Sequence, residues 1–118
     1  MTVFYQPSPD DLTEVTRAYE EVECPWRELW YTQWLIRTGQ MNKGYSYSNE
    51  RQRRSVVFIG RADSWEQFQD TVAHEVRHVV DDIIWYYRVE NKGEPPAYTQ
   101  GELARQMAPA IRAIACPC

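Results

Sequence analysis

Two histidines and a glutamate in the second half of the chain have the types and spacing of a metal site. His74, Glu75 and His78 form the pattern His-Glu-x-x-His, and the chain has no other histidine. On a helix, residues four apart lie one above the other, so His74 and His78 can both turn a ring nitrogen toward one metal ion, with Glu75 beside it. The pattern predicts a zinc site in which Glu75 is the general base.

A helix must position this motif, and the sequence predicts one over about residues 65 to 89. Its apolar residues gather on one side, and both histidines gather near the opposite side together with an acidic residue. Two pairs could form a capping box at its start: Asp63 with Glu66, or Ser64 with Gln67. We therefore expect a buried helix whose second face lines a cleft.

A third ligand must come from elsewhere, because a catalytic zinc ion takes three protein ligands and keeps one position for water. The candidates are Glu90, Glu94 and Glu102. Glu90 falls on the apolar side of the helix by the same angular count and is disfavoured. A helical hairpin through Gly93, the expected left-handed residue at the helix end, would return Glu94 beside the motif, while Glu102 stays open as the alternative.

Further helices are expected before and after the motif. The first begins at Ser8 and ends before Pro25, the second spans residues 26 to 38, and the last starts at the proline pair after Glu94 and reaches about Met107, with Pro109 kinking or ending it. The aromatic residues of the second helix are expected in the core rather than in a substrate groove.

Strand patterns predict a β-hairpin directly before the motif helix, from residues 45–48 and 55–60, and residues 3–6 read as a strand or an extended arm. The expected fold class is therefore α+β, with a small sheet packed on three to four helices and the motif helix central. At 118 residues, the chain is expected to form a single domain over 1–118.

The composition indicates which partners and which cellular compartment to expect. The net charge of −4 argues against nucleic acid as a partner, and the arginines between residues 51 and 54 read as a solvated loop or strand edge. No stretch approaches the ~18 apolar residues of a membrane span, and we do not expect a signal peptide at the N-terminal residues.

Three cysteines without a secretory signal suggest free thiols, and Cys116-Pro117-Cys118 reads as a plain tail rather than a soft-metal site. A cytoplasmic protein is expected.

One known family shares two motifs with this chain, in the same order and spacing. They are His74-Glu75-x-x-His78 and, after a short interval, Glu94-x-x-Ala97-Tyr98. Together they resemble the gluzincin branch of the zincin metallopeptidases in its minimal form, and residues 44 to 105 are similar to small phage-encoded and prophage-encoded metallopeptidases. The resemblance implies a zincin-like fold and a Zn²⁺ ion bound by His74, His78 and Glu94.

The resemblance also implies a role for Glu75 as general base, and for the strand at residues 55–60 as a sheet edge that holds an extended peptide or protein substrate. Tyr98, four residues after Glu94, is a candidate to assist the oxyanion, although a packing or ligand-orienting role is favoured. Asp81 or Asp82 is suited to orient a ligand histidine, with a solvated helix acid as the equal alternative.

These observations favour a zinc-dependent metallopeptidase that hydrolyses a peptide or related amide bond. The alternative is a non-catalytic zincin-like protein in which a structural zinc ion stabilises the fold. A metal-free helical adaptor with a chance motif is the third hypothesis.

Overall fold

A computed structural model describes residues 1–115, and the predictions for Cys116 and Cys118 lie outside this range. Over the described residues, the chain is an α+β protein with four α-helices, one short 3-10 helix and a three-stranded mixed sheet. The predicted α+β class is confirmed. No helix in this range is long and apolar enough to cross a membrane.

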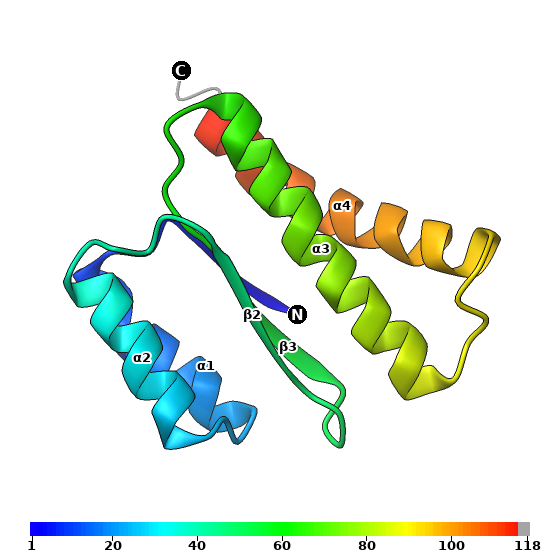
Figure 1. Ribbon diagram of the computed structural model, residues 1–118, viewed down its shortest axis with the longest axis horizontal. Helices are drawn as coiled ribbons and strands as arrows, with labels where there is room; N and C mark the ends of the chain where they lie inside the picture. The colour runs from blue at the N-terminus through cyan, green and yellow to red at the C-terminus, as the bar shows by residue number, and fades with distance from the viewer. Residues whose placement is uncertain (116–118) are drawn as a thin grey trace. The chain divides into compact units, whose positions relative to one another are not determined.

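The structure divides into two units, one from residue 1 to 75 and one from residue 76 onward. Helix α3 (Trp65–Tyr87) runs from the first unit into the second, and α4 (Glu94–Ala115) belongs wholly to the second (Figure 1). Each unit is described by itself below. The expectation of a single domain over the chain stays a prediction.

The sheet belongs to the first unit and has the order β1-β3-β2. Strands β2 (Gly44–Asn49) and β3 (Arg54–Ile59) pair antiparallel, which confirms the predicted hairpin, and β1 (Thr2–Tyr5) pairs parallel to β3. Because β3 has a neighbour on both sides, the expectation that residues 55–60 form a sheet edge for substrate is wrong. The edge of the hairpin is β2.

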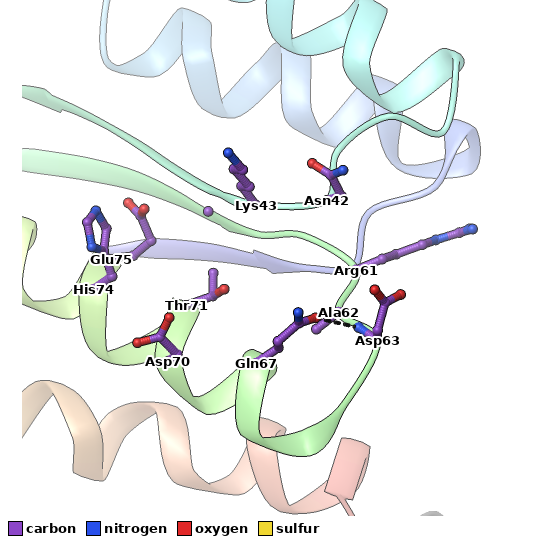
Figure 2. A pocket seen from close by; sticks show the side chains of 11 residues that line it. Asn42, Lys43, Arg61, Ala62, Asp63, Gln67, Asp70, Thr71, His74 and Glu75 are labelled. Atoms are coloured by element: carbon purple, nitrogen blue, oxygen red, sulfur yellow. Dashed lines mark hydrogen bonds between the residues drawn. The ribbon is translucent and has the colours of Figure 1, made fainter.

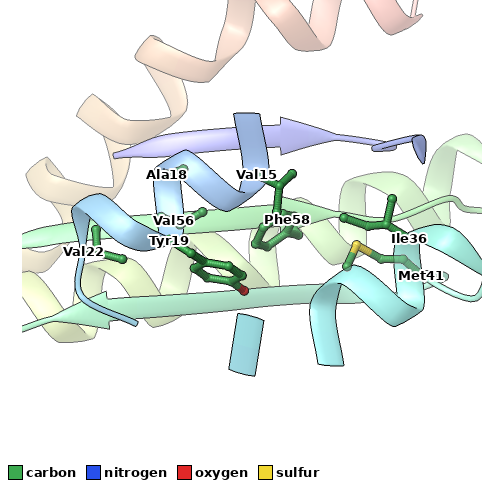
Figure 3. Close-up of a cluster of buried hydrophobic side chains, with 8 residues drawn as sticks. All are labelled: Val15, Ala18, Tyr19, Val22, Ile36, Met41, Val56 and Phe58. Carbon is green, nitrogen blue, oxygen red and sulfur yellow. The ribbon is translucent and has the colours of Figure 1, made fainter. Parts of the chain in front are cut away.

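Helices α1 (Leu12–Glu21) and α2 (Trp26–Arg37) build the core of this unit on one face of the sheet (Figure 3). A 3-10 turn, η1 (Pro9–Asp11), precedes α1, and the Ser8 backbone N–H donates to Asp11 Oδ2 at 2.8 Å as expected of a helix start. Phe58 of β3 is fully buried and its ring lies 5.5 Å from that of Tyr19.

The aromatic side chains of α2 are not in the core, so that expectation is wrong for its three tryptophans. Trp26, Trp30 and Trp34 are 69%, 63% and 42% exposed. They are spaced four residues apart and therefore lie along one side of the helix. The opposite side carries the buried residues Thr32 and Ile36, and Thr32 Oγ1 shares a 2.9 Å hydrogen bond with the Tyr19 hydroxyl.

Helix α3 ends earlier than predicted, and the left-handed residue at its end is not the expected Gly93. Arg88 has the left-handed conformation, with φ of 51°, and the Val89 N–H donates to the Ile84 carbonyl oxygen at 3.0 Å, which is the pattern of a helix C-cap. Gly93 is also left-handed, with φ of 71°, but it lies directly before α4. Pro109 does not end α4, which continues to Ala115.

Candidate metal and catalytic site

A pocket of about 510 Å³ lies in the first unit, between the first half of α3 and the segment that leads into β2 (Figure 2). The α3 side carries Asp70, Thr71, His74 and Glu75, whose side chains are directed toward this pocket. Asn42 and Lys43 lie on the opposite side. Of the helix face predicted to line a cleft, this pocket includes His74 but not His78 or Asp82.

The start of α3 is fixed by the second of the two predicted capping pairs. Ser64 Oγ accepts a hydrogen bond from the Gln67 N–H at 3.1 Å, and Gln67 Oε1 accepts one from the Asp63 N–H at 2.9 Å (Figure 2). The Gln67 side chain thus reaches one residue further back than in the usual capping box. These two bonds set where the helix begins, and so which of its residues line the pocket.

Glu75 is the buried acid of this pocket. It is only 4% exposed, and its side chain packs against the backbone of Gly44 at the start of β2. A Cβ atom added to Gly44 would lie 2.6 Å from Glu75 Oε1 and 2.8 Å from its Cδ. The carboxylate thus lies at the pocket wall, between α3 and the start of β2.

Replacing Gly44 by alanine should therefore move the Glu75 side chain without changing its chemistry. If Glu75 is the general base, the Gly44→Ala variant should lose turnover by about 10- to 100-fold, because a misplacement of about 1 Å can cost that much. Steady-state kinetics on a peptide substrate measures this loss. Gly101→Ala is the matched control, because its added methyl group meets nothing within 4 Å; an equal loss in both variants would contradict the prediction.

His74 and His78 are both exposed on α3. The helix is continuous through the motif, so two residues four positions apart lie on the same side of it. His74 lines the pocket beside Glu75. The first part of the motif thus has the local helical geometry that the sequence predicts.

The other predicted residues all belong to the second unit. Glu94 is the first residue of α4 and is exposed, and Tyr98, one turn later, is 74% exposed. Glu102 accepts hydrogen bonds from Arg105 at 2.6 and 2.9 Å and from Gln106 at 3.2 Å. These bonds hold the pKa of the Glu102 carboxyl at about 2, below its usual range. Glu90 is exposed after the end of α3.

The predicted metal ligands are only partly assembled as a zinc ion would require. Over residues 1–115, no three His, Cys, Asp or Glu side chains gather in a metal-binding arrangement. The paired histidines and the buried acceptor of Glu75 are the groups that a zinc ion and its attacking water require. The third ligand stays a prediction.

The two aspartates after His78 differ in their surroundings. Asp81 Oδ1 accepts a hydrogen bond from Arg77 Nε at 2.9 Å, and both side chains are more than half exposed. Asp81 is therefore a solvated helix acid paired with Arg77. Asp82, four residues after His78, keeps the predicted orienting role as a hypothesis.

Sequence reasoning missed several pocket residues that a simple signal could have found. Asp70 precedes His74 by four residues and Thr71 precedes Glu75 by four, so each lies on the same helix side as its partner. Nothing in the local sequence marks Gly44 as a pocket residue. Its contact with Glu75 joins residues 31 positions apart, and no local pattern encodes it.

Comparison with models of known protein families, with curated proteins and with solved structures found no match for this chain.

Proposed function

We propose that this protein is a zinc-dependent metallopeptidase of the zincin type, acting on a peptide or related amide bond. The observation that supports this most strongly is the position of Glu75. Its buried side chain packs against Gly44 and lines a pocket beside His74, on the helix that also carries His78. A purely packing role would favour an apolar residue at this position, because moving a carboxylate out of water costs free energy that an apolar side chain does not incur.

The proposed zinc ligands are His74, His78 and Glu94. A zinc ion bound there would act as a Lewis acid toward water and toward the substrate carbonyl. Glu94 is favoured over Glu102 because the Glu102 carboxylate is already hydrogen-bonded to Arg105 and Gln106.

Glu75 carries the proton in the proposed reaction. Its carboxylate accepts a proton from water as the oxygen–carbon bond to the substrate carbonyl forms. It then delivers that proton to the amide nitrogen as the carbon–nitrogen bond breaks, so the products are a carboxylic acid and an amine. The contact with Gly44 restricts where the carboxylate can lie during both transfers.

An extended substrate is proposed to lie along β2, in place of the 55–60 strand that the sequence suggested. In the sheet, β2 is paired only with β3, so its second side can accept a further strand. The strand begins at Gly44, which also lines the pocket. A peptide paired with β2 would thus reach the pocket at the end that Glu75 occupies.

The test is cleavage of a complex peptide library. Zinc-loaded protein should generate new peptide termini that mass spectrometry detects, a metal chelator should abolish them, and added zinc should restore them. The control is the Glu75→Gln variant prepared in the same way. If zinc is bound and no peptide is cut, the result supports the alternative of a non-catalytic zincin-like protein with a structural zinc ion.

A further inference from the structure

A second hollow, of about 890 Å³, lies beside the pocket in the same unit. Its wall is the aromatic side of α2, where Tyr31 and Trp34 are 49% and 42% exposed. Their rings are stacked, with centroids 6.2 Å apart and planes inclined by 20°. The stacked pair presents a large apolar surface to the hollow.

The base of the hollow is also apolar. Leu35 of α2 is half-buried, and Met41, which is 6% exposed, is a flexible side chain that adapts its shape to what it contacts. Tyr45 of β2 donates its hydroxyl hydrogen bond to the Glu28 carboxylate. That bond anchors the hydroxyl end of Tyr45, so the ring is available as apolar surface.

Burial and the bond to Glu28 both raise the pKa of Tyr45, which keeps its hydroxyl protonated and able to donate. Lys43 is the one charged side chain among the residues that line the hollow. The hollow therefore favours an uncharged occupant, because it offers no set of charged partners to a buried ion.

The hollow and the pocket of Glu75 share part of their lining. Asn42, Lys43 and Gly44 line both, and Gly44 is the residue against which Glu75 packs. Gly44 meets Glu75, and the next residue of β2, Tyr45, lines the hollow. Because successive side chains of a strand point to opposite faces, a peptide paired with the start of β2 would direct one side chain toward Glu75 and its neighbour toward the aromatic wall of α2.

We propose that this hollow is the substrate side-chain subsite of the enzyme. It would accept a large uncharged apolar side chain, aromatic or long aliphatic, next to the bond that is cut. The proposal rests on the proposed peptidase function and adds the substrate class to it. Tyr31 and Trp34 are then specificity-determining residues.

The experiment compares cleavage specificity in wild-type protein and two matched variants. Zinc-loaded wild-type protein is incubated with a proteome-derived peptide library, and the residues around each cut are read by mass spectrometry. We expect large apolar residues to dominate one position beside the cut. Synthetic peptides with Phe or Ala at that position then give kcat/KM for each.

In the Trp34→Ala variant, the preference for Phe over Ala should fall at least about 10-fold, chiefly through kcat/KM of the Phe peptide, because a lost apolar contact of this size has effects of that order. The Tyr31→Ala variant should change in the same direction. Trp26→Ala is the control: Trp26 is an exposed tryptophan of the same helix that does not line the hollow, so its variant should keep the wild-type preference.

Each result has a distinct meaning. Cleavage without any side-chain preference, or a preference that neither Trp34→Ala nor Tyr31→Ala reduces, overturns the subsite and leaves the peptidase function standing. An equal loss in Trp26→Ala also overturns it, because the effect would then be one of helix stability. No cleavage by zinc-loaded wild-type protein removes the peptidase function, and the subsite with it.

Discussion

The Glu75→Gln variant should bind zinc and fold like the wild type but turn over peptide about 10²- to 10⁴-fold more slowly, the usual contribution of a positioned general base. Glutamine has nearly the same volume and can keep the contact with Gly44. Its neutral amide cannot take up the proton of the attacking water. The loss should therefore appear in kcat, measured with saturating peptide, and not in zinc content.

The control for this variant is Glu66→Gln, which makes the same change at an exposed acid in the first turn of α3. Glu66 does not line the pocket, so its variant should keep wild-type turnover. If Glu75→Gln retained full turnover on a verified substrate, Glu75 could not be the general base.

The second large effect is expected from the zinc ligands. His74→Ala should weaken zinc binding by more than about 100-fold, because even residues that only orient a ligand change metal affinity by about 10- to 100-fold. A competition titration with a zinc-binding dye measures the dissociation constant. The same titration on Glu94→Ala and Glu102→Ala distinguishes the two candidates for the third ligand, and we expect the loss in Glu94→Ala.

Arg77→Ala is the control for the ligand variants. Arg77 lies between the two histidines in the sequence, but its guanidinium is exposed and pairs with Asp81. Its removal should leave zinc affinity unchanged. Wild-type affinity in His74→Ala would contradict the proposed site, and equal losses in His74→Ala and Arg77→Ala would point to damage to the helix.

Local patterns in the sequence predicted the elements of this fold well. The strand patterns at residues 45–48 and 55–60 predicted the hairpin, and one of the two predicted capping pairs, Ser64 with Gln67, forms at the start of the motif helix. These features depend on residues a few positions apart, which a sequence displays directly. The helix end differed because Arg88, a residue without an intrinsic preference for the left-handed conformation, takes the place expected of Gly93.

Contacts between residues far apart in the sequence could not be predicted from local patterns. The parallel partner of β3 is β1, more than fifty residues earlier, and this pairing turned the expected edge strand into the central one. The exposed tryptophans of α2 show the same limit, since hydrophobicity alone assigns them to a core. Which side of a helix faces a sheet depends on the whole packing arrangement, and here Thr32 and Ile36 occupy that side.

For the candidate site too, the sequence predicted the local features but not the long-range contacts. The motif fixed His74, Glu75 and His78 on one helix, because their spacing is local. The contact between Glu75 and Gly44 and the hollow beside it come from the meeting of α3, β2 and α2, which no single segment encodes.

The most direct test of the proposed zinc site is the metal content of the protein purified without added metal or chelator, measured by mass spectrometry. We expect about one zinc ion per wild-type chain, and a greatly reduced amount in His74→Ala and in Glu94→Ala, as a three-ligand site requires. No zinc in the wild-type protein, even after zinc is offered at neutral pH, would contradict the proposed metallopeptidase.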